Sequence, residues 1–381
     1  MAVRGVLLGL AFCLLGTAAR AQTARSVLVR DTAELQSALR ALSPGTVVRL
    51  APGEYQGGLY VGSASGTPEQ PIRIESAVSD KPARIVGGPN GIHLSKVAHL
   101  EIRDIHFARA TGNGLNIDDG GDLEHPSHHV ELRDLVVEDV GASGNQDGIK
   151  LSGVTDFRVE NCKVERWGAG GSAIDMVGCK QGEIVNCHFR HTRDDINANG
   201  VQAKGGSTKV AIRGCRFEHA GSRAINLGGS TGRQFFRPRL GIDAEARDLL
   251  VEDCTIVGSM AAVAFVGVDG AIVRRNLIYR PRRWVLRILQ ENQDPSMVPA
   301  RNGQFLENII MFRSGEIATT VNAGGGTKPQ TFRFEGNSWY CEDQPARSEP
   351  RLPVAELRGI HGVNPGFKDA EAGDFRREPP E

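Results

Sequence analysis

A short strand-like phrase recurs along this chain and ends each time at an equivalent position. Each copy alternates apolar and polar residues and closes on a cysteine or on a residue that replaces it, as in residues 157–162 (FRVENC). The closing positions lie roughly 22 to 39 residues apart, a period typical of stacked repeats. They form the predicted column Ile105, Leu135, Cys162, Cys187, Cys215, Cys254, Asn276, Ile309 and Asn337.

One such repeat cannot bury its own apolar face, so repeats of this kind stack and each contacts mainly its neighbours. Because side chains alternate between the two faces of a strand, the apolar positions of successive repeats share one interior. The sequence therefore predicts an all-β fold, a right-handed parallel β-helix over residues 47–341. Residues 342–381 are expected to form a C-terminal tail, rich in proline and charge, that wraps or frays.

The N-terminal segment 22–46 is expected to contain a capping helix. The pattern predicts this helix from Ala33 to Leu42, opening at Asp31 or Thr32, with Glu34 placed as in a capping box. An amphipathic helix here would close the open end of the solenoid and cover its first edge strand.

Residues 1–21 have the pattern of a secretory signal peptide, with an apolar run and a small-residue cleavage site near Ala21. The run is too short to span a bilayer, and no other segment is apolar for long enough. We therefore expect a secreted or periplasmic protein without a membrane span. The 45 Lys and Arg residues balance the 45 Asp and Glu residues, which argues against nucleic acid as the general partner.

The cysteines of the mature chain are expected to be free. Four of them occupy one position of successive repeats, namely Cys162, Cys187, Cys215 and Cys254. Stacked residues of parallel strands have β carbons about 4.8 Å apart, whereas a disulfide needs about 3.8 Å. The column therefore predicts a ladder of buried thiols that act as small apolar groups. Cys179 and Cys341 lie off this ladder and have no partner that the sequence indicates.

The same alternation predicts which residues point outward. A second recurring triplet precedes each phrase, and its two apolar residues point inward while the central one points out. The predicted central residues are His93, Asn116, Lys150, Asp175, Gln202, Asn226, Ala264, Arg287 and Thr320. Two flanking outward columns add Asp147, Asn199, Lys204, Arg223 and Trp284 to the same face.

The longest interruption of the repeat, residues 228–247, is expected to be a loop beside the binding face. It contains Arg233 and Arg237, and Lys and Arg concentrate between Lys204 and Arg239. Cationic groups bind the carboxylates of acidic sugars, and flat rings such as that of Trp284 stack on sugar faces. The composition of this face therefore predicts an acidic polysaccharide as the partner.

Lys204 is the first candidate for a catalytic group. Elimination across a uronic acid removes the proton next to the carboxylate, so the site must neutralise that carboxylate and supply a base. Arg223, one repeat later, is expected to hold the carboxylate and to favour the neutral form of Lys204. The residues expected to bind neighbouring sugars are Lys150, Asn199, Gln202, Asn226, Arg233, Arg237, Trp284 and Arg287.

Other groups suggest different chemistry. Asp194 and Asp195 are a candidate carboxylate pair for glycoside hydrolysis, although adjacent strand residues point to opposite faces. His125, His128 and His129 resemble a metal site only weakly, because no acid cluster accompanies them.

The opening of the chain contains the segments 43–50 (SPGTVVRL), 52–55 (PGEY) and 70–74 (QPIRI). With these segments the chain resembles the polysaccharide lyases of the chondroitinase-B and alginate-lyase family. In that family two acidic calcium ligands lie one residue apart, and the catalytic lysine follows five residues after the second. The corresponding positions here are Asn197, Asn199 and Lys204, so the lysine matches and the acids do not.

The resemblance implies lyase chemistry with Lys204 as the base, and it raises the question of calcium. The oxygen ligands that this chain offers are Asp147, Asp175, Asn197 and Asn199. We therefore predict an exported enzyme that cleaves a uronate-containing polysaccharide by β-elimination. The alternatives left open are a glycoside hydrolase using Asp175, Asp194 or Asp195, an epimerase, and a β-helix that binds glycans without cleaving them.

Overall fold

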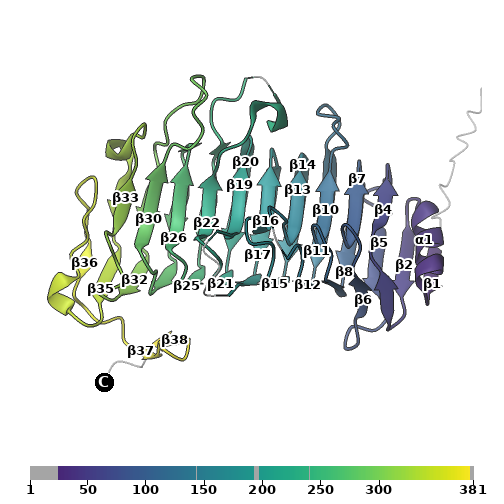
Figure 1. The fold of residues 1–381 in the computed structure, drawn as a ribbon, viewed down its shortest axis with the longest axis horizontal. Coiled ribbons are helices and arrows are strands. Elements are labelled where there is room, and N and C mark those ends of the chain that lie inside the picture. Colours follow the sequence, from purple (N-terminus) through teal and green to yellow (C-terminus); the bar gives the residue numbers. More distant parts are fainter. Residues whose placement is uncertain (1–24, 143, 193–196, 240, 378–381) are drawn as a thin grey trace, which may run out of the picture.

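The computed structural model describes residues 25–142, 144–192, 197–239 and 241–377. Over these residues the chain winds into an elongated solenoid whose turns add strands to three parallel sheets (Figure 1). The predicted all-β parallel β-helix is therefore confirmed. The predicted signal peptide lies outside the described residues. Among the residues described, no helix is long and apolar enough to cross a membrane.

Sheet A receives the strand of each repeat phrase. Its strands, in spatial order, are β1 (Arg25–Val29), β2 (Thr46–Leu50), β5 (Ile72–Ser76), β8 (Ala98–Arg103), β11 (Ser127–Arg133), β14 (Val154–Glu160), β17 (Lys180–Val185), β20 (Ser207–Arg213), β24 (Leu250–Glu252), β28 (Ile272–Arg274), β31 (Gln304–Leu306) and β34 (Arg333–Glu335), with β23 (Ala246–Arg247) and β27 (Val268–Asp269) beside them. Strands of this sheet alternate buried apolar and outward polar residues, as predicted from the phrases.

Sheet B follows sheet A along each turn. Its strands are β3 (Glu54–Gln56), β6 (Ala83–Val86), β9 (Ile105–Ala108), β12 (Val136–Glu138), β15 (Lys163–Glu165), β18 (His188–Arg190), β21 (Arg216–Glu218), β25 (Thr255–Val257), β29 (Leu277–Tyr279), β32 (Ile309–Phe312), β35 (Ser338–Cys341) and β36 (Ile360–His361). Its inward side chains, among them Phe189 and Phe217, stack in the core with ring centroids 5.0 Å apart.

Sheet C completes each turn. Its strands are β4 (Leu59–Gly62), β7 (Ile92–Ser95), β10 (Leu115–Asp118), β13 (Ile149–Ser152), β16 (Ser172–Val177), β19 (Asn199–Lys204), β22 (Arg223–Gly228), β26 (Ala261–Val266), β30 (Trp284–Leu289) and β33 (Val321–Ala323). Parallel pairing in register, as between Leu115, Ile149 and Ile174, places equivalent side chains in columns about 4.8 Å apart.

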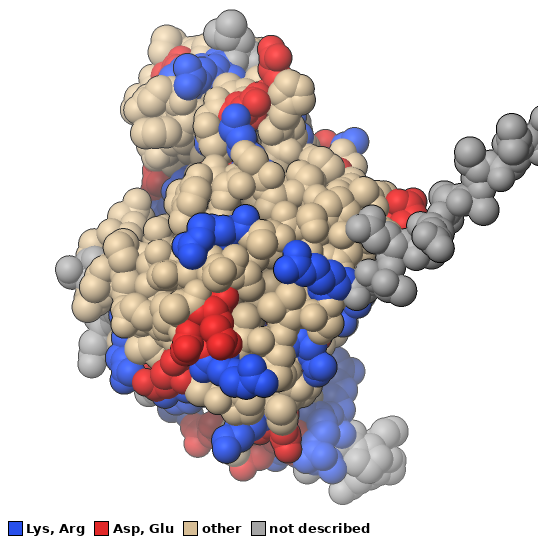
Figure 2. All heavy atoms as spheres, turned by 90° about the vertical axis from the view of Figure 1, so that its right-hand side faces the viewer, with Lys and Arg blue, Asp and Glu red and all other residues tan. Residues whose placement is uncertain are grey.

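Helix α1 (Thr32–Arg40) covers the N-terminal end of the solenoid (Figure 1). The side chain of Asp31 caps it by accepting the N–H of Glu34 at 2.8 Å, and Leu35 and Leu39 are buried against the first strands. The predicted capping helix is confirmed, although it ends two residues earlier, at Arg40, and strand β1 precedes it. Figure 2 shows this end, where positive and negative side chains are scattered over a mostly uncharged surface.

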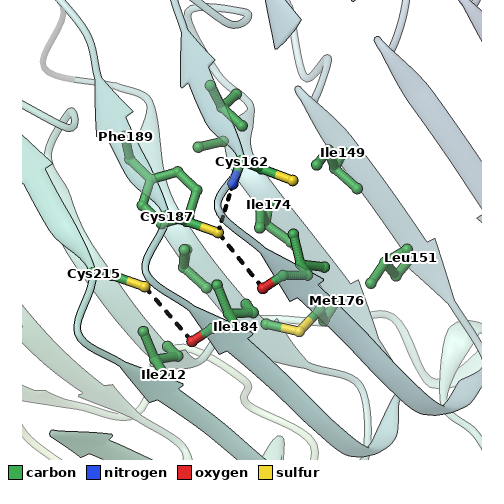
Figure 3. Close-up of a cluster of buried hydrophobic side chains, with 14 of the residues drawn as sticks. Ile149, Leu151, Cys162, Ile174, Met176, Ile184, Cys187, Phe189, Ile212 and Cys215 are labelled. Carbon is green, nitrogen blue, oxygen red and sulfur yellow. Dashed lines mark hydrogen bonds between the residues drawn. The ribbon is translucent and has the colours of Figure 1, made fainter. Parts of the chain in front are cut away.

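The predicted cysteine ladder lies inside the solenoid, at the turn from sheet A to sheet B (Figure 3). Its four thiols are free and buried, as expected. The N–H of Cys162 donates to the sulfur of Cys187 at 3.4 Å, and the thiol of Cys187 lies 3.6 Å from the carbonyl oxygen of Val159. Cys179 and Cys341 are also free and buried, and burial raises the pKa of the Cys179 thiol to about 12.

Asparagines continue this column toward the C-terminal end. The amide oxygen of Asn308 accepts the N–H of Asn276 at 2.9 Å, and the Asn308 amide donates to Asn337 Oδ1 at 2.9 Å. The prediction of Ile309 at this position is wrong by one residue. Asn308 occupies this position, because its amide can hydrogen-bond along the stack. Ile309 instead begins β32 and pairs with Leu277 of sheet B.

The tail after residue 341 wraps around the end of the solenoid. Its strand β36 extends sheet B by pairing with β35, and β37 (Phe367–Asp369) and β38 (Asp374–Arg377) form an antiparallel hairpin near the lower edge in Figure 1. The ring of Phe375 in this hairpin packs against that of Tyr279, with centroids 5.3 Å apart. Short 3-10 helices span Arg233–Phe235, Pro329–Thr331 and Pro345–Arg347.

Candidate functional site

The outward face of sheet C holds the predicted polar strip. Lys150 pairs in register with Asp175, Asp175 with Gln202, and Gln202 with Asn226. The residues on either side of each, such as Ile174 beside Asp175, are buried in the core. The side chains of this column therefore line up on one face, as the alternation predicted.

Two lysines and two aspartates form a cluster at the centre of this face. Lys150 Nζ lies 3.3 Å from Asp147 Oδ2 and contacts Asp175 Oδ2 directly. Lys204 Nζ lies 3.3 Å from the same oxygen of Asp175. The aspartate side chains are only 2% and 1% exposed, whereas those of Lys150 and Lys204 are 20% and 17% exposed. The lysines therefore lie between the carboxyl groups and solvent.

Neutral groups hold this cluster in place. Gln202 Oε1 lies 3.4 Å from both Lys204 Nζ and Ser172 Oγ, and the N–H of Ser172 donates to Asp147 Oδ1 at 2.7 Å. In the described part of the chain, the second oxygen of Asp175, Oδ1, is buried without a hydrogen-bond partner. This oxygen can therefore accept one further donor.

The charge of the cluster depends on pH. Burial, together with the carboxyl group of Asp175, raises the pKa of Asp147 to about 7, although Lys150 opposes the shift. Burial lowers the pKa of Lys150, but the carboxyl groups of Asp175 and Asp147 outweigh it, so the net shift is upward. Lys150 therefore remains a cation, while Asp147 gains its negative charge only near neutral pH.

The substitution Asp147→Asn is expected to flatten the pH dependence of stability. The pKa of Asp147 is about 7 in the folded protein and about 3.9 in an unfolded chain. Its stabilising contribution is therefore fully present below about pH 4 and is lost as the pH rises to about 7. Between about pH 4 and pH 7 the unfolding free energy of the wild-type protein should therefore fall relative to that of the asparagine variant. Urea unfolding at several pH values tests this, and equal pH profiles would contradict it.

Arg223 lies on the same face but at the other end of the strand. It pairs with Asn199, and Asn199 precedes Lys204 by about 16 Å along the strand. Its guanidinium forms an ion pair with Glu291 and donates to Asn226 Oδ1 at 3.2 Å. The predicted adjacency of Arg223 and Lys204 is therefore wrong, because they project from opposite ends of neighbouring strands.

Trp284 and Arg287 extend the face toward the C-terminal end. The guanidinium carbons of Arg283 and Arg287 lie 4.5 Å and 4.3 Å from the centre of the Trp284 ring. Arg287 pairs with Asn322 and donates to its Oδ1 at 3.1 Å. The column therefore ends at Asn322, and the predicted Thr320 is wrong by two residues because sheet C continues through β33.

The insertion after β22 packs over the turns that follow sheet C. Arg237 forms a two-point ion pair with Asp119, whose side chain is 1% exposed. Arg233 stacks on Phe236 and donates to the carbonyl oxygen of Ile242 at 2.7 Å. Arg237 therefore anchors the insertion on the solenoid, and Arg233 holds the insertion together. Their predicted contact with substrate stays a prediction.

The calcium ion that the resemblance implied does not fit this arrangement. Calcium needs several oxygen ligands that are free of other cations. Asp175 Oδ2 contacts the ammonium groups of both Lys150 and Lys204, and Asp147 Oδ2 contacts that of Lys150. A dication at this position would meet two positive charges. The other two predicted ligands are amide residues, Asn199 in β19 and Asn197 just before that strand.

A cavity of about 480 Å³ lies elsewhere, between sheet B and the C-terminal tail. Its charged lining includes Arg190, Arg216, Arg280, Arg282, Glu218 and Glu316. Arg216 pairs with Glu218 at 2.6 Å, and Arg280 pairs with Glu316. Because these residues belong to sheet B and the segments beside it, the cavity is separate from the lysine cluster on sheet C.

Residues 90–278 match the family model described as a right handed beta helix region. The chain is a right-handed parallel β-helix. Similar solved structures include an alginate lyase from Paenibacillus sp. str. FPU-7, with a TM-score of 0.51 and 19% identity over 89% of this chain and 99% of that one. A search of curated proteins finds no significant match.

Two further solved structures share the architecture with different named activities. A pectate lyase superposes with a TM-score of 0.54 and 12% identity, covering 92% of this chain and 84% of its own. A lacto-N-biosidase from Eubacterium ramulus superposes with a TM-score of 0.52 and 11% identity, covering 88% of this chain and 68% of its own. At these identities the likeness establishes the fold, and the chemistry of this chain has to be argued from its own residues.

Sequence reasoning missed several residues that shape the site. Asp119 and Glu291 anchor Arg237 and Arg223 from segments 118 and 68 residues away, so no local pattern marks them. Glu245 is fully buried and accepts the N–H groups of Gly205 and Thr231. No local pattern marks Glu245 either, because it stands in the charged segment 242–248 (IDAEARD).

Proposed function

We propose that the protein cleaves an acidic, uronate-containing polysaccharide by β-elimination, with Lys204 as the base. The observation that carries this proposal is the lysine cluster on the outward face of sheet C. Lys204 lies 3.3 Å from Asp175 and is partly exposed, and Lys150 holds a second positive charge on the same carboxylate. A base beside a fixed cation is what removal of the proton next to a sugar carboxylate requires.

Their contacts distinguish the two lysines. Lys150 contacts both Asp147 and Asp175, whereas Lys204 contacts Asp175 alone. The pKa of Lys150 is raised by the two aspartates despite burial, so Lys150 keeps its proton. Lys204 is therefore the lysine assigned to proton transfer, and Lys150 to the uronate carboxylate.

In the proposed reaction, Lys204 takes the proton from C5 of the uronate. The electron pair of the C5–H bond forms the C4–C5 double bond while the C4–O bond breaks, and the proton on Lys204 passes to the leaving oxygen. Lys150 stabilises the negative charge that develops on the uronate carboxylate. Gln202, beside Lys204, is proposed to position this sugar. Asn199 pairs with Arg223 and is assigned to the adjacent sugar, and the buried Asn226 holds Arg223 in place.

Neighbouring sugars are assigned to the other end of the face. Arg223 is proposed to bind the carboxylate of an adjacent uronate, a change from its predicted place beside Lys204, and Arg287 and Trp284 to bind beyond it. Binding there requires an anionic sugar to compete with Glu291 for Arg223. Export after cleavage near Ala21 is part of the same proposal, because polysaccharides of this kind lie outside the cell.

A glycoside hydrolase is the second candidate, favoured by one observation. Lys150 holds the carboxyl groups of Asp147 and Asp175 together, and a raised pKa such as that of Asp147 suits a general acid. Both groups lie behind the lysines, which weighs against this reading. Asp194 and Asp195, the other predicted candidates, lie outside the described residues.

The test is to incubate the pure protein with alginate, pectate, chondroitin and heparin-type glycans. β-Elimination produces an unsaturated uronate that absorbs in the ultraviolet, and its appearance with one polymer is the expected result. New reducing ends without unsaturation would select the hydrolase. Inverted uronate stereochemistry without chain cleavage would select an epimerase, and retention of unchanged glycan would select a binding protein.

A further inference from the structure

Three histidines converge on sheet A, away from the lysine cluster. The backbones of His99 in β8 and His129 in β11 both have positive φ angles, 47° and 51°. At such a residue the strict alternation of strand side chains is interrupted, so His128 and His129 both lie outside the core between buried Ser127 and buried Val130. Because His128 pairs with Ala98, the three rings come together on adjacent strands.

The geometry of the rings suits a shared ligand. The donor nitrogens of His99, His128 and His129 all lie within 4.8 Å of one another. His99 and His129 stack with centroids 4.4 Å apart, and the Nδ1 atoms of His128 and His129 are separated by 2.8 Å. Two nitrogens bound to one zinc ion at about 2.0–2.1 Å lie about 3.3 Å apart in a tetrahedral site. Small side-chain rotations would therefore reach that arrangement.

Acidic side chains lie near the cluster. The negative charges of Glu69 and Asp156 act on His99 and His128 respectively, so an incoming cation would find acids nearby.

The positive φ angles do not themselves mark a metal site. Asp156, Gln181 and Lys209 have similar angles at the equivalent place in later strands. What distinguishes β8 and β11 is that histidines, His99 and His129, occupy the positive φ position, and that His128 precedes the second of them. The case for a metal site therefore depends on the histidine side chains and not on the backbone conformation.

We propose that His99, His128 and His129 form a binding site for a transition-metal dication of the zinc class. The ion would join β8 to β11 and leave at least one coordination position facing solvent. Imidazole nitrogen suits Zn²⁺, Cu²⁺ and Ni²⁺ better than Ca²⁺ or Mg²⁺, so the site discriminates against the hard cations. This inference is independent of the proposed lyase activity.

Calorimetric titration of the full, tag-free protein with Zn²⁺ tests the proposal. One ion per chain is expected to bind, and Ca²⁺ is expected not to compete. His128→Ala should weaken the binding by more than about tenfold. His99→Asn and His129→Asn should do the same, and asparagine is chosen because it tolerates positive φ.

His125→Ala is the matched control. His125 is 82% exposed, lies in the loop before β11 and pairs with Asp122 rather than with the cluster, so its loss should leave zinc affinity unchanged. Zinc should also raise the thermal midpoint of the wild-type protein but not that of the triple variant, as expected for a ligand that binds only the folded chain. Absence of binding, or binding unchanged in the triple variant or abolished by His125→Ala, would overturn the proposal.

Discussion

Replacing Lys204 with alanine is expected to lower polysaccharide cleavage by about 10²–10⁴-fold, the range typical for loss of a general base. The fold should survive, because Asp175 keeps its contact with Lys150 and the Lys204 side chain is partly exposed. Lys204→Arg should be nearly as inactive, since arginine keeps the positive charge but does not give up its proton. The measurement is the initial rate of unsaturated product formation by the wild-type protein and by each of the two variants.

Lys209→Ala is the control for this experiment. Lys209 lies five positions later in β20, on the outside of sheet A, and is exposed. Its loss should leave the rate unchanged. If Lys204→Ala turned over normally, Lys204 would be removed from the mechanism, whereas full activity in Lys204→Arg alone would show that its charge, not proton transfer, is what matters.

Asn308→Ala is expected to cost about 4 kcal/mol of unfolding free energy. Asn308 is fully buried, and its amide accepts from the N–H and Nδ2 of Asn276 and donates to the carbonyl of Val273 and to Asn337. Alanine would leave several buried groups without partners, at roughly 1–3 kcal/mol each before relaxation. Urea unfolding followed by circular dichroism gives the value directly.

Two comparisons sharpen this prediction. Gln304→Ala, in the adjacent strand β31, alters a half-buried side chain and should change stability by less than about 1 kcal/mol. Cys215→Ala, in the same column, removes a thiol that makes only weak sulfur hydrogen bonds, such as those to carbonyl oxygens at 3.3 Å and 3.6 Å, and should cost less than Asn308→Ala. A loss at Asn308 no larger than at Cys215 would show that the amide ladder contributes little.

The repeat and the polar strip were predictable because both follow from short-range alternation. Each strand of sheet C buries the neighbours of Lys150, Asp175 and Gln202, so their outward direction depends only on nearby residues. The errors at Ile309 and Thr320 arose where an apolar residue adjoins the true position, Ile309 beside Asn308 and Val321 beside Asn322, and a shift of one or two residues reads equally well. In the structure, pairing with neighbouring strands removes that ambiguity.

The sequence by itself determined the solenoid, the buried thiols and the outward face with Lys150 and Lys204, because these depend on a period repeated many times along the chain. Only the tertiary structure decided which charges meet. Arg237 reaches Asp119, Arg223 reaches Glu291, and His99 joins His128 and His129. Such contacts depend on the paths of loops and on which strands stack, and those paths are set by packing between distant segments rather than by any local pattern.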